Sequence, residues 1–324
     1  MPPEARNTGD RRCVVAVLKS LDDRHAAWIE AVDQRVRVIR VADRATWLEE
    51  APDAEIIMGF RPLRNGAVRS RHLRWVHALG AGVEDLCEDV AGTEILVTNS
   101  HVHGGAIADH VFAFILAHTR RMREAYDFQT ARRWVRQELL GTPLAGRTIG
   151  ILGLGAIGVE VARRAVAFGM RVVGTKRHPA PIPGVDRVWP PEGTDAVLRE
   201  ASILALTLPL TSATRGILGA REIALLPAGA FVVNIARGDL VDQPALVAAL
   251  QSGRLSGAGL DVFTEEPLPP DSPMWTVPRL MITPHVAGDF PEYMDRMMPL
   301  FCENLRRYLA GRPLENVVDP ALGY

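Results

Sequence analysis

The chain has 324 residues, of which 48% are hydrophobic, and a formal net charge of −1 at pH 7. This length suffices for two domains with separate cores, and the near-neutral charge argues against a nucleic-acid partner, which would favour a basic face. No apolar run approaches the roughly 20 residues that cross a membrane, and no apolar signal core opens the chain. The three cysteines are widely spaced and predict neither disulfides nor a metal site. We therefore expect a cytoplasmic protein.

The first hundred residues alternate strand-like with helix-like segments. Apolar runs predict strands at 14–18, 36–41, 54–58, 73–77 and 94–98, and helices are expected at 22–32 and 46–50. Because strands that alternate with helices form parallel sheets, this part predicts a small α/β domain that ends near Asn99. The run Gly80-Ala81-Gly82 follows one of these strands, and taken alone it favours a plain turn over a backbone cradle for an anion.

A long apolar helix is predicted next, at 107–122. Its apolar residues lie on most faces, which indicates a largely buried helix. An amphipathic segment at 126–140 follows and contains Trp134. Together the two segments are too apolar for the exterior of one small domain, so we expect them to pack across a two-fold axis in a homodimer.

Residues 147–177 carry the most informative pattern of the chain. A predicted strand at 148–152 leads into Gly153, Gly155 and Gly158, spaced as G-x-G-x-x-G, and a periodic helix and a second strand at 171–175 follow. The three glycines permit a tight turn, the approach of a pyrophosphate and the close packing of helix on strand. The free N–H groups and the positive dipole end of the helix face the phosphates. The sequence therefore predicts a dinucleotide-binding unit.

The alternation continues to the end of the chain. Helices are expected at 195–200, 218–226 and 243–252, and strands at 202–208, 230–235, 257–262 and 280–283. With the two strands of the glycine-containing unit, this predicts a doubly wound sheet of six strands. A terminal helix, expected at 299–310, is free to cross back to the first domain because the last strand already ends at Thr283.

Three polar residues follow predicted strand ends of the second domain, where open parallel sheets bind ligands. Taken singly, each residue has a simpler interpretation. Arg237 would be a surface arginine, Glu266 a solvated loop residue and His285 a core histidine. Taken together they form a consistent catalytic set. Arg237 offers two parallel donors to a carboxylate, and the imidazole of His285 can move a proton. Glu266 would orient the imidazole ring and favour its protonated form.

These motifs make the sequence resemble the D-isomer-specific 2-hydroxyacid dehydrogenase family. The matching stretches are LAGRTIGILGLGAIG (144–158), LPLTSATRG (208–216), VVNIARGDLVDQPAL (232–246), GAGLDVFTEEPLP (257–269) and ITPHVAG (282–288). The resemblance implies an α/β protein with two doubly wound parallel-sheet domains. A Rossmann dinucleotide-binding domain at 101–288 is inserted in a flavodoxin-like substrate domain made of 1–100 and 289–324. Arg237, Glu266 and His285 are then the catalytic residues of a reversible 2-oxo acid reduction.

The resemblance also implies binding residues. The substrate is expected on the backbone of Gly80, Ala81 and Gly82, together with Arg237 and His285, which reverses the local preference for a plain turn. Asp261 matches the position that binds the nicotinamide carboxamide, and Leu208, Pro209 and Thr214 match the adenosine side. The full set expected to bind the cofactor is Gly153, Gly155, Ala156, Ile157, Gly158, Thr175, Lys176, Arg177, Leu208, Pro209, Thr214, Ile235, Ala236, Arg237, Asp261, His285 and Gly288.

Three departures from the family pattern bear on the ligands. Ala156 stands where arginine often touches the pyrophosphate, and the stretch 288–291 after His285 is unusual. The acidic residue that usually ends the second strand is replaced by Lys176, followed by Arg177. A carboxylate there would repel the extra phosphate of NADP, whereas cations attract it. We therefore expect a preference for NADP(H), with NAD(H) as the alternative.

The motifs leave the exact substrate open. We expect a glyoxylate- or hydroxypyruvate-like 2-oxo acid, and the alternatives are a D-lactate, phosphoglycerate or phosphonate dehydrogenase that uses NAD. No regulatory domain follows Tyr324, which makes a biosynthetic phosphoglycerate role less expected. An alternative that is not an enzyme is a dinucleotide-sensing, corepressor-like binding protein, because such a protein can have the same fold. We expect substrate selectivity to depend on residues 60–62, 101–103 and 290–293.

Overall fold

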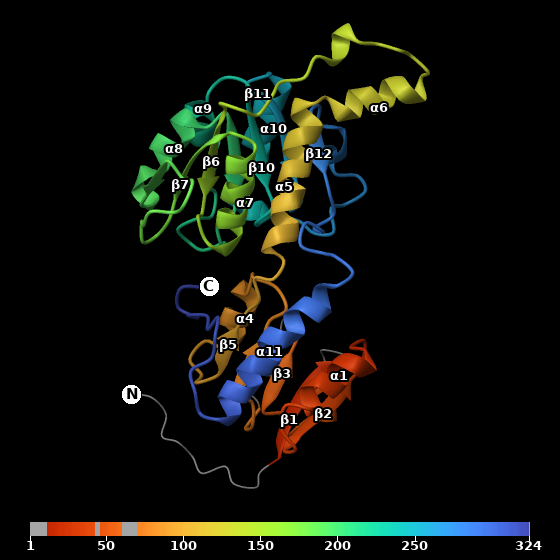
Figure 1. The fold of residues 1–324 in the computed structure, drawn as a ribbon, viewed down its shortest axis with the longest axis vertical. Coiled ribbons are helices and arrows are strands. Elements are labelled where there is room, and N and C mark those ends of the chain that lie inside the picture. The colour runs from red at the N-terminus through yellow and green to blue at the C-terminus, as the bar shows by residue number, and fades with distance from the viewer. Residues whose placement is uncertain (1–11, 43–45, 60–69, 324) are drawn as a thin grey trace. The chain divides into compact units, whose positions relative to one another are not determined.

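The chain divides into two compact units. The computed structural model describes residues 12–42, 46–59 and 70–323. The first unit combines Met1–His103 with Phe290–Tyr324, and the second unit is Gly104–Asp289. In Figure 1 the first unit accordingly takes its colours from both ends of the chain, red to orange and blue. In the ranges described, no helix is both long and apolar enough to cross a membrane.

The first unit is built on a five-stranded parallel sheet in the order β2-β1-β3-β4-β5. Its strands are β1 (Cys13–Leu18), β2 (Val36–Val41), β3 (Ile56–Met58), β4 (Trp75–His77) and β5 (Leu96–Thr98). Helices α1 (Asp23–Glu30) and α11 (Tyr293–Leu309) share one core with the sheet, and α2 (Trp47–Glu50) and α4 (Glu84–Asp89) share another. Both faces are covered, and the strand order is the flavodoxin-like one that was predicted.

The second unit is built on a seven-stranded parallel sheet in the order β12-β11-β10-β9-β6-β7-β8. Its strands are β6 (Thr148–Leu152), β7 (Arg171–Thr175), β8 (Arg187–Trp189), β9 (Ile203–Leu206), β10 (Ala230–Asn234), β11 (Leu255–Leu260) and β12 (Leu280–Ile282). The order reverses between β6 and β9, as in Rossmann sheets, and ligands bind at such a point. The Rossmann prediction is therefore confirmed.

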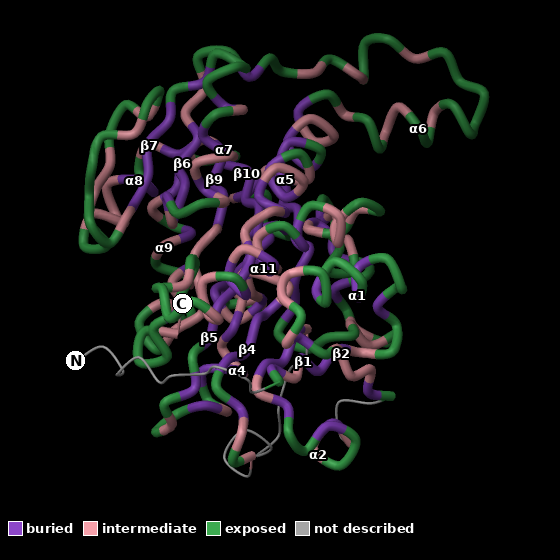
Figure 2. The backbone as a smooth tube through the Cα atoms, turned by 60° about the horizontal axis from the view of Figure 1, so that its bottom comes forward, coloured by how far each residue is buried: buried purple, intermediate pink, exposed green. Residues whose placement is uncertain are grey.

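Helices cover both faces of this second sheet. One core holds α5 (Gly104–Thr119) and α7 (Ala156–Ala167), and the other holds α8 (Thr194–Glu200), α9 (Ala220–Leu225) and α10 (Gln243–Gln251). The short 3₁₀ helices are η1 (Gln137–Leu139), η2 (Pro191–Gly193), η3 (Gly238–Leu240) and η4 (Pro273–Thr276). Figure 2 shows the central strands as buried, which explains their nearly continuous apolar sequences.

The long helix predicted at 107–122 is wrong at its C-terminal end. α5 ends at Thr119, and α6 (Met122–Thr130) follows after Arg121, whose φ of 55° is left-handed and interrupts the helix. The amphipathic segment at 126–140 contains the end of α6 and the short 3₁₀ helix Gln137–Leu139. The chain returns where the Thr142 N–H donates to the Thr119 carbonyl oxygen at 2.8 Å. Residues 120–141 thus form an arm, yellow in Figure 1, that leaves the second unit and comes back, and Figure 2 shows it mostly exposed.

Two further elements differ from the prediction. The second sheet has seven strands rather than the predicted six. The prediction missed the edge strand β8, because it has only three residues, none of them buried, and no apolar run marks it in the sequence. α11 begins at Tyr293 rather than at Pro299, which lies inside the helix. Proline is common in the first turn of a helix, and this misplaced the predicted start. Burial of neighbours such as Met298 and Phe301 offsets the backbone hydrogen bond that Pro299 cannot make.

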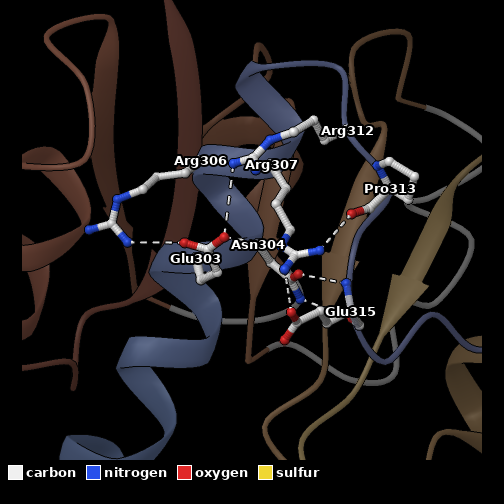
Figure 3. Close-up of polar contacts among 7 residues, drawn as sticks. All are labelled: Glu303, Asn304, Arg306, Arg307, Arg312, Pro313 and Glu315. Carbon is white, nitrogen blue, oxygen red and sulfur yellow. Dashed lines mark hydrogen bonds and ion pairs between the residues drawn. The ribbon is translucent and has the colours of Figure 1, made fainter.

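A polar network attaches the segment after α11 to the C-terminal half of that helix (Figure 3). The fully buried side-chain amide of Asn304 makes hydrogen bonds of 2.8 Å and 3.0 Å to the backbone of Glu315. Arg307 donates to Glu303 at 3.1 Å and also contacts the Glu315 carboxylate. Just beyond the network, the Asn99 N–H donates to the Asn316 carbonyl oxygen at 3.1 Å. The C-terminal segment therefore fixes the backbone that follows β5.

Candidate active site

The turn between β6 and α7 has the geometry that a phosphate-binding loop requires. Gly153 has a φ of 105°, and a Cβ there would lie 2.9 Å from the carbonyl carbon of Thr207. A Cβ at Gly158 would lie 2.2 Å from the Gly153 oxygen, so α7 packs on the turn only without a side chain. A Cβ at Gly155 would meet nothing within 4 Å, and Gly155 is the N-cap of α7. The open space at this helix end suits the pyrophosphate of a dinucleotide.

The carboxyl end of β7 carries the residues expected beside the adenosine ribose. Thr175 is buried, and its Oγ1 accepts a hydrogen bond from the Gly153 N–H at 3.2 Å. This side chain therefore supports the glycine turn, a role that the sequence did not predict. Lys176 is half-buried, with its N–H bonded to the Trp189 carbonyl oxygen at 2.9 Å, and Arg177 is exposed. Two cationic side chains thus follow β7 directly, at the place where the sequence lacks a carboxylate.

Arg237 lies in a tight turn directly after β10. The buried Asn234 side chain holds this turn, because its Nδ2 donates to the Arg237 carbonyl oxygen at 2.7 Å and its Oδ1 accepts from the Ala236 N–H at 3.0 Å. The next residue, Gly238, packs against the loop after β11: a Cβ there would lie 2.0 Å from the Phe263 carbonyl carbon. The turn that carries Arg237 is therefore in direct contact with the loop that leads to Glu266.

Glu266 and His285 meet in the structure as the sequence predicted. His285 Nδ1 lies 2.7 Å from Glu266 Oε2, and Glu266 Oε1 accepts the Phe263 N–H at 2.8 Å. Both side chains remain partly open to solvent, with exposed fractions of 47% for His285 and 33% for Glu266. Because Nδ1 faces the carboxylate, the other ring nitrogen, Nε2, is left for a ligand. A carboxylate at this distance also fixes the orientation of the ring.

Asp261 organises the loop that carries His285. Its buried carboxylate accepts the Thr283 hydroxyl at 2.5 Å and the backbone N–H groups of Val286 at 3.0 Å and Ala287 at 2.9 Å. The His285 N–H in turn donates to the Asp261 carbonyl oxygen at 2.8 Å. These bonds hold His285 at a φ of 54°, a left-handed conformation that a non-glycine residue needs support to adopt. Asp261 therefore has a structural role beside the predicted contact with the carboxamide.

The remaining residues predicted to bind the cofactor also lie in the second unit. Ala156 and Ile157 form the first turn of α7, and Gly288 follows the loop that carries His285. In the loop after β9, the Thr214 hydroxyl donates to the Pro209 carbonyl oxygen at 2.7 Å, and Leu208 packs on the core. Ile235 and Ala236 are buried behind Arg237. Of the residues predicted to govern selectivity, 60–62 lie outside the part of the chain that the structure describes.

The predicted substrate loop, Gly80-Ala81-Gly82, belongs to the first unit and follows β4. All three residues are half-buried, and a Cβ at Gly80 would meet nothing within 4 Å. In the described ranges, neither the Gly80 N–H nor the Ala81 N–H donates to a protein acceptor. Such N–H groups suit an anion, which favours the cradle over the plain turn.

Comparison with known proteins agrees with this chemistry. Residues 112–287 match the family model for the NAD binding domain of D-isomer specific 2-hydroxyacid dehydrogenases. A glyoxylate/hydroxypyruvate reductase B of Pectobacterium carotovorum subsp. carotovorum is 38% identical over 231 residues, 70% of this chain and 72% of that protein. A D-3-phosphoglycerate dehydrogenase of Methanocaldococcus jannaschii is 32% identical over 281 residues, 84% of this chain and 53% of that protein. The chain thus spans about half the length of that relative.

A solved structure extends the similarity to the fold. The NADPH-dependent glyoxylate/hydroxypyruvate reductase of Sinorhizobium meliloti, in complex with NADP and sulfate, matches this chain with a TM-score of 0.84 and 28% identity. The match covers 97% of this chain and 100% of that one, so it includes both units.

Proposed function

This chain belongs to the D-isomer-specific 2-hydroxyacid dehydrogenase family, and from that premise we propose that it reduces a small 2-oxo acid to the D-2-hydroxy acid with NADPH. The substrate we propose is of the glyoxylate or hydroxypyruvate class. The observation that carries the proposal is the 2.7 Å contact between His285 Nδ1 and Glu266 Oε2, in a unit that also holds the dinucleotide-binding glycine turn. The proposal extends to this chain the activity named for its reductase relatives.

The test is a turnover assay with a panel of 2-oxo acids and both nicotinamide cofactors. Glyoxylate and hydroxypyruvate should be reduced faster than pyruvate. Faster reduction of 3-phosphohydroxypyruvate would instead favour the phosphoglycerate activity named for the M. jannaschii relative. Tight cofactor binding without turnover of any of these acids would favour a dinucleotide-sensing binding protein and defeat the proposal.

The mechanism assigns one task to each polar residue. A bound nicotinamide supplies the hydride. The Arg237 guanidinium grips the substrate carboxylate and polarises the keto oxygen, and the Ala81 and Gly82 N–H groups add hydrogen bonds to the carboxylate. His285 donates the Nε2 proton to the developing alkoxide, because Nδ1 is engaged by the carboxylate of Glu266. Glu266 stabilises the protonated ring before the transfer and fixes its orientation.

The cofactor preference rests on the end of β7. Lys176 and Arg177 follow this strand directly, and the neighbouring positions from 175 to 178 contain no acidic residue. A cationic pair attracts the ribose phosphate that distinguishes NADP from NAD, whereas a carboxylate would repel it. The NADP named in the structure of the S. meliloti reductase supports the same choice.

We expect kcat/KM with NADPH to exceed kcat/KM with NADH for one good substrate. Replacing the cationic pair, as in Lys176→Asp with Arg177→Ala, should narrow or reverse this ratio because the new carboxylate repels the phosphate. The kcat with saturating cofactor should stay close to that of the wild type, since the catalytic residues are untouched. A wild-type ratio in favour of NADH would overturn the assignment.

The exposed arm supports a homodimer as the working assembly. Trp134 is 99% exposed and Leu140 is 70% exposed, which is unusual for residues of a folded monomer. Tryptophan is enriched at the energetic centres of interfaces, and a symmetric dimer would bury the same arm on both copies. We propose that the arm packs against a second copy of this chain.

Sedimentation at micromolar concentration should therefore give twice the mass of one chain. Trp134→Glu should shift the equilibrium toward the monomer because it places a charge in the interface. Glu192→Gln, a polar change at an exposed residue of η2 and outside the arm, is the control and should leave the mass unchanged. A monomeric wild-type protein at this concentration would contradict the proposal.

A further inference from the structure

Three consecutive carbonyl groups of the loop assigned to the substrate carboxylate are held by donors from the first unit. They belong to Leu79, Gly80 and Ala81. The Tyr293 hydroxyl donates to the first of them, and the Ser100 N–H donates to the second at 3.4 Å. The Asn99 side-chain amide donates to the third at 2.9 Å. The donors come from the start of α11 and from the two residues after β5.

These bonds determine where the N–H groups of the loop point. In a trans peptide, the carbonyl group and the following N–H lie in one plane and point in opposite directions, and these peptides are trans. A donor that fixes one carbonyl group therefore turns the next N–H to the other side. Tyr293 in this way aims the Gly80 N–H, and the two residues after β5 aim the N–H groups of Ala81 and Gly82.

The donors are themselves held in place. Asn99 is only 4% exposed, and its carbonyl oxygen accepts the Asn316 side-chain amide at 3.4 Å. The Tyr293 ring packs edge-on against Phe290, with centroids 5.5 Å apart, and its hydroxyl oxygen lies 3.5 Å from His103 Nδ1. Because the hydroxyl proton is directed to Leu79, the oxygen is left to accept from His103.

Charge from the strand before the loop does not attract the anion. Burial lowers the pKa of His77, the last residue of β4, to about 3, so its ring is neutral at physiological pH. The row of oriented N–H dipoles is then the feature of this loop that suits a carboxylate.

We propose that Tyr293 is a positioning residue for the substrate carboxylate, which acts by fixing the Leu79 carbonyl group and thereby aiming the Gly80 N–H. The inference rests on the proposed function, because it assigns the loop to the carboxylate of a 2-oxo acid. It extends the carboxylate-binding row from the two N–H groups of Ala81 and Gly82 to three.

Tyr293→Phe removes the hydroxyl and keeps the ring. We expect the KM of the best 2-oxo acid to rise about five- to tenfold, the effect of losing roughly one hydrogen bond. The kcat and the KM for NADPH should change less than about twofold, because a carboxylate contact is equally strong in the ground state and the transition state. Tyr308→Phe is the matched control: this tyrosine also lies in α11, but its hydroxyl donates to Glu55 Oε1 at 2.6 Å.

Binding of oxamate to the complex with NADPH gives a measurement that needs no turnover. Its Kd should rise by the same factor in Tyr293→Phe and stay unchanged in Tyr308→Phe. An unchanged KM and Kd in Tyr293→Phe would overturn the inference, and so would an equal rise in both variants, which would indicate general loosening of α11. A wild-type protein that binds oxamate but reduces no 2-oxo acid would defeat the proposed function, while the comparison of Kd values would still decide the role of Tyr293.

Discussion

His285→Ala is expected to lower kcat for 2-oxo acid reduction by about 10²–10⁴-fold, which is the usual contribution of a general acid. The imidazole is the proton donor in the proposed mechanism, and alanine leaves only water to take its place. NADPH should still bind, because the glycine turn and the end of β7, which are assigned to the pyrophosphate and the adenosine ribose, are left unchanged. Steady-state kinetics and a fluorescence titration with NADPH measure the two quantities.

The control for this experiment is His72→Ala. His72 is a partly exposed histidine of the first unit, 3.7 Å from the Asp53 carboxylate, and it has no part in the mechanism. Its loss should leave kcat unchanged. Wild-type turnover in His285→Ala would show that another group donates the proton, and the assignment would then be abandoned.

Arg237→Lys is expected to lower kcat/KM by on the order of 10²-fold although the charge is kept. The guanidinium presents two parallel donors in a fixed plane, so one arginine can bind a carboxylate and polarise the adjacent keto oxygen. A lysine ammonium is a single point charge on a flexible stem, and it cannot hold both groups in this geometry. Because the keto oxygen gains negative charge in the transition state, kcat should fall, and KM should rise because the carboxylate is held less well.

A matched control is available at Arg221, which binds the Asp195 carboxylate through two nitrogen atoms, each 2.8 Å from an oxygen. This pair is exposed, with 65% of the arginine side chain open to solvent, and exposed pairs contribute little to stability. Arg221→Lys makes the same chemical change and should leave kcat/KM unaltered. Similar kinetics for Arg237→Lys and the wild type would contradict the role of Arg237 in binding the carboxylate.

Some features of this protein could be predicted because their cause is local in the sequence. The strand at 148–152, the three glycines and the strand at 171–175 were all predicted with the bounds or spacing that the structure shows. Apolar periodicity marks a buried strand, and the glycines are required by contacts within the same turn, such as the one between Gly158 and Gly153. The strand ends then gave the positions of Arg237, Glu266 and His285, since parallel strands present their carboxyl ends on one side of a sheet.

Local pattern misplaced other elements. The helix predicted at 107–122 extends to Met122, but α5 ends at Thr119, where the chain leaves for the arm. Pro299 suggested a helix start, although α11 runs through it because its buried face is stabilised by the core of the first unit. β8 has three residues and forms only because β7 offers a free edge beside it. In each case packing overrode the preference of the local sequence.

What the sequence by itself determined is which residue types stand at which strand ends, and therefore the class of chemistry. Only the tertiary structure decided which of them touch. Glu266 and His285 are 19 positions apart, and they meet because β11 and β12 are neighbours in the sheet. Tyr293 and Leu79 are 214 positions apart, and no periodicity links them. Residue preferences act over a few neighbours along the chain, whereas such contacts depend on strand order and helix packing, which arise from the whole fold.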